Sequence, residues 1–95
     1  GTGNSLPATF ELNQNYPNPF NPSTMISYSL PKSAKVELVI YNILGQKVAT
    51  LVDGPQSAGH HETIWNARNM SSGLYFLQMR ADDATIGVRK LMLLK

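Results

Sequence analysis

Short apolar runs separated by turn signals at regular intervals constrain the fold of this chain more than any other feature. The runs are rich in β-branched and aromatic residues, and clusters of Gly, Asn, Asp or Ser stand between them. This pattern is typical of an all-β sandwich or barrel, and 95 residues suffice for one such domain. We expect strands at residues 24–30, 35–42, 46–52, 59–66, 73–81 and 85–94, with a short additional strand near Phe10–Leu12.

One segment, residues 36–44, also fits a helical period in its apolar positions. Four of the six residues 36–41 are nevertheless β-branched or aromatic, and no N-cap residue precedes them. The segment "YNILGQK" reads better as a tight hairpin, in which Asn42 opens the turn and Gly45 takes the positive φ. We therefore predict a strand here.

Alternation with period two assigns side chains to the two faces of each strand. The residues expected to point inward are Val36, Leu38, Ile40, Tyr75, Leu77 and Met79. Trp65 ends its strand and is expected in the core or at its rim, while Met25 and Ile26 leave the facing of the first long strand open.

The segment "NYPNPFNPST" at 15–24 combines three prolines with two aromatic residues. Proline cannot donate to a β ladder, and it restricts the residue before it to extended conformations. We expect residues 15–23, named the strap below, to be semi-rigid, to pack Tyr16 and Phe20 under the sandwich, and to cover a strand edge without offering it for further pairing.

The last run, "LMLL" at 91–94, is apolar at both parities and is flanked by Lys90 and Lys95. A solvated edge strand does not have this composition. We expect the run either to be buried on both faces or to present an open edge or patch to another protein.

Composition excludes several classes of function. Charged residues make up 15%, the net charge is +2, and the basic residues form no stripe interleaved with aromatics, which argues against nucleic-acid binding. No cysteine is present, so disulfides, thiolate metal sites and cysteine nucleophiles are excluded. No run is long enough for a membrane helix and no signal peptide opens the chain, so we expect any export signal to lie in a longer parent or elsewhere in this segment.

Candidate catalytic and metal-binding residues do not assemble into a site. His60 and His61 are adjacent and face opposite sides of a strand, so they cannot chelate one metal together. Asp82 and Asp83 suit a turn between two strands. The serines and isolated glutamates form no triad or carboxylate pair, and the sequon at Asn69 reads as a chance match. We expect no catalytic residues, cofactor, metal or small-molecule substrate.

"SSGLYFLQM" at 71–79 resembles the tyrosine corner of immunoglobulin-like sandwiches. Gly73 permits a tight entry into the strand, and the hydroxyl of Tyr75 is expected to bond to nearby backbone. A simple inward-facing tyrosine predicts the same burial.

Five segments in order, "YPNPFNPST", "VELVIYNILGQKV", "SAGHHETIWNA", "SGLYFLQM" and "RKLMLLK", resemble the type IX secretion C-terminal sorting domain, type A. The resemblance covers Leu12 to Lys95. It implies an antiparallel immunoglobulin-like β-sandwich at the C-terminus of a larger exported protein. The family's motif positions fall on Tyr16, Pro17, Asn18, Pro19, Phe20, Asn21, Gly73 and Tyr75, and its terminal motif, read by the translocon, falls on Lys90, Leu91, Met92, Leu93, Leu94 and Lys95. Ser71 stands where the family often has proline.

The resemblance implies a non-catalytic module, at residues 10–95, that directs an upstream cargo across the outer membrane for secretion or surface attachment. Its implied partners are the outer-membrane translocon and a sortase-like processing enzyme, and its route leads through the periplasm to the cell surface. Residues 1–9 read as a linker or a cloning remnant. The alternative is a carbohydrate-binding or adhesive immunoglobulin-like module of a surface enzyme, which requires exposed coplanar aromatics on one face; the alternation is not expected to supply them.

Overall fold

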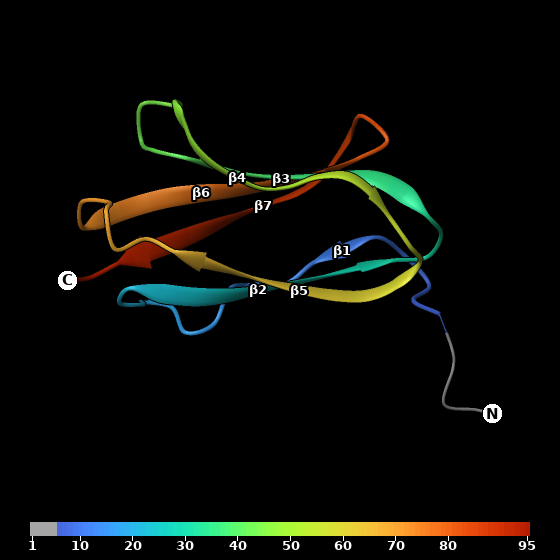
Figure 1. The fold of residues 1–95 in the computed structure, drawn as a ribbon, viewed down its shortest axis with the longest axis horizontal. Coiled ribbons are helices and arrows are strands. Elements are labelled where there is room, and N and C mark those ends of the chain that lie inside the picture. Colours follow the sequence, from blue (N-terminus) through green and yellow to red (C-terminus); the bar gives the residue numbers. More distant parts are fainter. Residues whose placement is uncertain (1–5) are drawn as a thin grey trace.

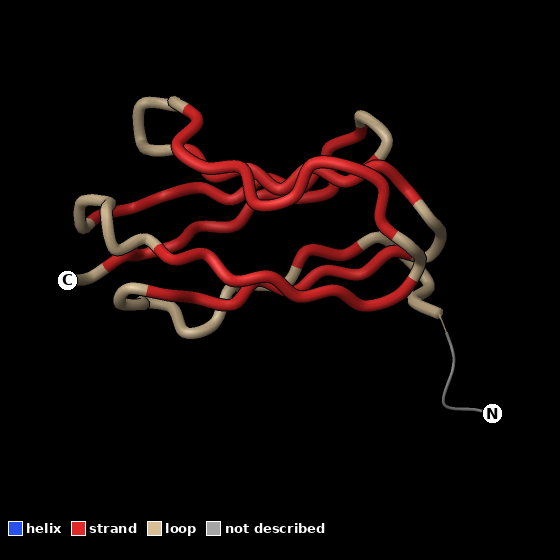
Figure 2. The backbone as a smooth tube through the Cα atoms, viewed as in Figure 1, coloured by secondary structure: helices blue, strands red, loops and turns tan. Residues whose placement is uncertain are grey.

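The computed structural model describes residues 6–95, and this part of the chain forms seven strands in two antiparallel sheets that pack face to face (Figure 1). The tube view shows the two layers, with the connections gathered at the two ends of the sandwich (Figure 2). Of the predicted linker, residues 1–5 lie outside the described residues. The all-β, immunoglobulin-like sandwich predicted from the sequence is confirmed.

The strands follow the predicted order along the chain. They are β1 (Glu11–Leu12), β2 (Ser23–Leu30), β3 (Ala34–Tyr41), β4 (Lys47–Gln56), β5 (Gly59–Asn66), β6 (Gly73–Ala81) and β7 (Ala84–Leu93). One sheet has the order β1-β2-β5, and the other has the order β4-β3-β6-β7. The edge strands of the four-stranded sheet are therefore β4 and β7.

Strand β4 continues past its predicted end at residue 52 to Gln56. The predicted strand ended just before the sequence "DGPQ", but Pro55 lies opposite Lys35 and Gly54 opposite Val36 in the β3–β4 ladder. Proline is tolerated on an edge strand, where one side of the backbone has no ladder partner. The prediction was wrong here because sequence alone does not say which strands are edges.

The core lies between the two sheets and contains every residue that alternation placed inward. The six predicted residues, Val36, Leu38, Ile40, Tyr75, Leu77 and Met79, are all buried. The structure also settles the facing of β2, since Ile26 is buried and Met25 is exposed. Trp65 is a core residue, as expected.

Two turns follow the predicted chemistry. Asn42 opens the β3–β4 turn: its Oδ1 accepts hydrogen bonds from the backbone N–H groups of Leu44 and Gln46, at 2.9 and 3.0 Å, while Gly45 has a φ of +79°. Asp82 and Asp83 form the β6–β7 turn with φ values of +49° and +69°. Short polar side chains tolerate this left-handed region better than other non-glycine residues do.

Tyr75 forms the predicted bond to nearby backbone. Its hydroxyl donates to the carbonyl of Ser71 at 2.7 Å, while its ring is buried. This bond ties the β5–β6 connection to β6. Within residues 6–95, no helix is long and apolar enough to cross a membrane.

Candidate functional site: the sealed end of the sandwich

The strap passes from one sheet to the other at one end of the molecule. It first lies beside β2, where the backbone groups of Tyr16 and Met25 exchange two hydrogen bonds of 3.0 and 2.8 Å. It then reaches β7, where the N–H of Phe20 donates to Met92 at 2.9 Å and the N–H of Leu94 donates to Phe20 at 3.0 Å. The strap therefore joins the two sheets, because it pairs with β2 beyond the short β1 and with the edge strand β7 of the other sheet.

Polar side chains extend this cover along β7. The side chain of Asn18 receives a hydrogen bond from the N–H of Met92 at 2.9 Å and donates to the carbonyl of Lys90 at 3.3 Å. Gln14, just before the strap, donates to the same carbonyl at 2.8 Å. Of the alternatives expected for the terminal run, the open strand edge is therefore not found, because backbone groups of Lys90, Met92 and Leu94 already have partners in the strap and beside it.

Phe20 closes the end of the core. Its side chain is 2% exposed, and its ring lies 5.7 Å from that of Trp65 on β5. The Trp65 ring in turn lies 5.3 Å from that of Tyr75 on β6, in an edge-on arrangement. Three aromatic rings, from the strap and from both sheets, thus pack as one cluster that seals this end.

Tyr16 does not share this burial, and the expectation that both strap aromatics pack under the sandwich is wrong for it. Its side chain is 79% exposed. Because its backbone pairs with Met25, whose side chain also points outward, the Tyr16 ring stands on the outer face of the three-stranded sheet. There it borders an apolar hollow of about 270 Å³ with Pro17, Met25 and Ile64.

A buried polar cluster holds the start of the strap in place. The amide nitrogen of Asn15, a residue 2% exposed, donates to Thr24 Oγ1 at 2.9 Å and to the carbonyl of Pro17 at 3.2 Å. Thr24 Oγ1 donates to the Pro17 carbonyl at 2.8 Å. Buried polar groups stabilise a conformation when all are bonded, so this cluster fixes the strap without an apolar anchor at residue 16.

The terminal residues divide into a buried and an accessible set. Leu91 and Leu93 are fully buried in the core, whereas Met92 is half-buried. The side chains of Lys90, Leu94 and Lys95 are exposed. Within this end, Lys95 Nζ donates to the carbonyl of Arg68 at 2.6 Å, and the N–H of Lys95 donates to Ser72 Oγ at 3.0 Å.

The strap, the β3–β4 turn, the tyrosine corner and the terminal run meet at this end of the sandwich, which we call the sealed end. Figure 1 shows the strap, the β3–β4 turn and the C-terminus on the same side of the molecule. A hollow of about 270 Å³ joins Asn42 and Ile43 of the β3–β4 turn to residues 71–75 of the tyrosine corner. Segments far apart in the sequence therefore form one continuous surface.

The outer face of the four-stranded sheet carries a feature that the sequence analysis missed. Tyr41 lies opposite Phe76 on the neighbouring strand, and both side chains are partly exposed on this face. Neither ring is fully exposed, so the pair does not contradict the expectation that alternation supplies no exposed coplanar aromatics. Alternation places each ring outward, but only the strand register shows that the two rings are neighbours.

The opposite outer face, on β2 and β5, is polar in the rows farther from the sealed end than Met25 and Ile64. Ser29 Oγ lies 2.8 Å from His60 Nδ1, while His61 points inward and stacks on Tyr28 at 5.2 Å. Burial raises the pKa of the Tyr28 hydroxyl above its ordinary value. Among residues 6–95, no three His, Cys, Asp or Glu side chains lie close enough to hold a metal ion.

Comparison with known protein families finds a match to the chain. The family described as the secretion system C-terminal sorting domain matches residues 14–93, from the start of the strap region to the end of β7. The chain belongs to the type IX secretion C-terminal sorting domain family. Comparisons with curated proteins and with solved structures give no significant match.

Membership in this family makes the chain a C-terminal sorting signal for type IX secretion. Sorting domains of this family are generally non-catalytic, and they imply an upstream cargo, contact with the type IX machinery, and export to the cell surface or the extracellular space. The matched range covers the strap, strands β2 to β7 and the terminal run as far as Leu93. The match thus includes the segments that build the sealed end.

Proposed function

We propose that this sorting domain carries an upstream cargo from the periplasm through an outer-membrane type IX translocon, and that the translocon recognises the folded domain at its sealed end. The family match over residues 14–93 is the observation that carries the proposal. The geometry of the domain supports recognition at the sealed end, because the strap, the tyrosine corner and the terminal run adjoin one another there. A sortase-like enzyme then acts on the delivered protein.

The terminal motif has two roles in this proposal. Leu91 and Leu93 act through folding, since their side chains are fully buried between the sheets. Lys90, Leu94 and Lys95 are exposed and supply the part that a partner contacts directly. Gly73 and Tyr75, with the strap, hold the surface around them in shape.

The test is a reporter protein fused upstream of the whole chain and expressed with a signal peptide in a type IX-competent host. We expect the fusion at the cell surface or in the medium, and the reporter alone in the periplasm. Deletion of Leu91–Lys95 is expected to leave the fusion in the periplasm. Normal delivery of the deletion variant, or failure of the intact fusion to leave the periplasm, contradicts the proposal.

The deletion also removes two core leucines, so a fold-preserving variant is needed beside it. Lys90→Gln combined with Leu94→Ser and Lys95→Gln changes exposed side chains and leaves Leu91 and Leu93 in place. We expect this variant to remain folded, as judged by its thermal unfolding, and to be delivered less well. Full delivery would show that these three side chains are not contacted by the translocon.

A further inference from the structure

The outer face of the four-stranded sheet carries an apolar patch beside the sealed end. In the ladder register, Tyr41 of β3 lies opposite Phe76 of β6, and Leu74 lies opposite Met92 one row nearer the end. The exposed side chain of Val88 lies in the row on the other side. These side chains are apolar or aromatic and all point away from the core.

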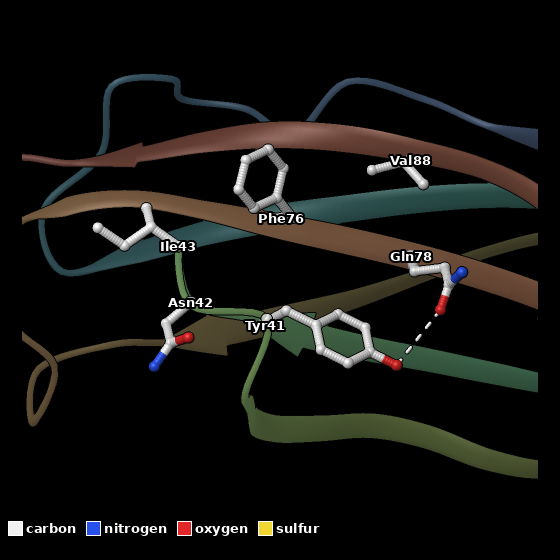
Figure 3. Close-up of a pocket in the computed structure, with 7 residues that line it drawn as sticks. Tyr41, Asn42, Ile43, Phe76, Gln78 and Val88 are labelled. Carbon is white, nitrogen blue, oxygen red and sulfur yellow. Dashed lines mark hydrogen bonds between the residues drawn. The ribbon is translucent and has the colours of Figure 1, made fainter.

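The β3–β4 turn borders one side of this patch. Ile43 is 70% exposed and Leu44 is 77% exposed, although large aliphatic side chains usually avoid such positions in a turn. Ile43, Tyr41, Phe76 and Val88 border an open hollow of about 420 Å³ (Figure 3). Figure 3 shows the ring of Phe76 between Ile43 and Val88, and Tyr41 held by its bond to Gln78.

Two lysines flank the aromatic pair across the whole width of the sheet. Lys47 on β4 lies opposite Tyr41, directly after a β-bulge in the β3–β4 ladder, and Lys90 on β7 lies opposite Phe76 in regular register. Both lysine side chains are exposed and stand on the edge strands. With three strand spacings between them, their backbones lie about 14 Å apart.

Acidic residues on this face lie only in a row farther from the sealed end. Asp53 lies opposite Glu37, and Glu37 opposite Arg80, beyond the row that contains Val88. The aromatic row itself and the Leu74–Met92 row contain no carboxylate. The patch is therefore apolar in the middle and purely cationic at its two sides.

An apolar centre with a charged rim is the usual composition of a protein docking surface. The cations select the partner, because carboxylates opposite both lysines favour association, whereas a cationic rim is repelled. The opposite outer face also carries exposed apolar side chains, Tyr16, Met25 and Ile64, but the paired rows there bring no lysine or arginine beside them. The four-stranded face is thus the one with a defined charge signature.

We propose that this patch, formed by Tyr41, Ile43, Phe76 and Val88 and flanked by Lys47 and Lys90, docks a component of the secretion machinery whose surface is apolar with carboxylates on two sides. The inference rests on the proposed function and specifies the outer face of the four-stranded sheet as the surface that the secretion machinery recognises. In this proposal the signal recognised by the secretion machinery is a property of the folded sheet. Lys47 and Ile43 lie far from the terminal run in sequence, so a signal made only of the linear C-terminal segment does not require them.

The experiment uses the same reporter fusion with two pairs of matched variants. Ile43→Ser with Val88→Ser removes two exposed apolar side chains from the patch, while Met25→Ser with Ile64→Ser does the same on the opposite face. Lys47→Glu reverses one flanking charge, and Lys35→Glu makes the same change at the far end of the sheet. All four variants change exposed side chains, and thermal unfolding of each purified domain checks that it remains folded.

We expect surface delivery to fall by about tenfold or more for Ile43→Ser with Val88→Ser and for Lys47→Glu, as for the loss of interface anchors or a paired charge, and to change little for the two controls. Full delivery of both patch variants overturns the inference. The proposed function then still stands if the intact fusion is delivered and the terminal deletion is not. Failure of the intact fusion contradicts the proposed function itself.

Two other occupants of the patch are tested with the purified domain. Sedimentation that shows a dimer, dissociated by Ile43→Ser with Val88→Ser, assigns the patch to a second copy of this chain and overturns the inference. Co-sedimentation with phosphatidylglycerol vesicles that depends on Lys47 assigns it to an anionic lipid surface and also overturns it. A monomer that does not bind these vesicles, together with the expected loss of delivery, supports a protein partner.

Discussion

The ring of Phe20 in the strap lies 5.7 Å from the ring of Trp65 in β5, and this contact anchors the strap over the end of the core. Phe20 is 2% exposed, whereas Tyr16, four positions earlier in the same strap, is 79% exposed. The two aromatic residues of one motif therefore have different roles. One stabilises the sandwich, and the other remains on the surface.

Phe20→Ala is expected to lower the free energy of unfolding by about 3–5 kcal/mol, because it leaves a cavity beside Trp65 and Tyr75. Tyr16→Ala is the matched control and is expected to cost less than about 1 kcal/mol, since the lost ring is mostly in solvent. Urea unfolding followed by Trp65 fluorescence measures both. Equal losses for the two variants would contradict the assigned roles.

The strands and their faces were predictable because each depends on local sequence. Val36, Leu38 and Ile40 alternate with more polar neighbours, and Asn42 with Gly45 marks the turn that follows. Period two then determines which side chains face the core. Only the end of β4 was placed too early, because proline and glycine are compatible with an edge strand as well as with a turn.

The strap could not be resolved from sequence to the same degree. An irregular backbone has no fixed repeat, so nothing local distinguishes the facing of Tyr16 from that of Phe20. The cover that Asn18 gives to Met92 is a contact between residues far apart in sequence. The Tyr41–Phe76 neighbourhood depends on the register between β3 and β6, which alternation leaves undetermined.

Tyr75→Phe tests the tyrosine corner. The hydroxyl donates to the Ser71 carbonyl at 2.7 Å, and its removal is expected to destabilise the domain by about 1 kcal/mol, the usual net worth of such a bond. Tyr41→Phe removes a longer bond of 3.3 Å to Gln78 on a partly exposed face and is expected to cost less. Thermal unfolding ranks the two variants, and the reverse order would mean that the corner bond contributes little.

Stability is expected to fall at alkaline pH through Tyr28. Burial raises the pKa of its hydroxyl above the ordinary value of 10.0, so the folded domain holds the proton more tightly than the unfolded chain does. The contribution of the protonated Tyr28 hydroxyl to the free energy of unfolding is therefore fully present below pH 10. It is lost as the pH rises through the pKa of Tyr28 in the folded domain. Unfolding of the native domain and of Tyr28→Phe between pH 8 and about pH 11 measures it. A slope unchanged by the substitution would show that Tyr28 is not its source.

Asn18→Ala tests whether the strap protects the edge of β7. Asn18 bonds to the N–H of Met92 and the carbonyl of Lys90, so its loss is expected to destabilise the domain by about 1–2 kcal/mol. It also leaves the N–H of Met92 without its partner on an edge strand, and exposed strand edges template association between chains. Hydrogen exchange at Met92 is expected to accelerate, and light scattering is expected to show self-association at high protein concentration. Asn21→Ala, at an exposed strap position, is the control and is expected to leave both measurements unchanged. If Met92 exchanges as slowly in Asn18→Ala as in the native domain, the backbone contacts of Phe20 alone protect the edge.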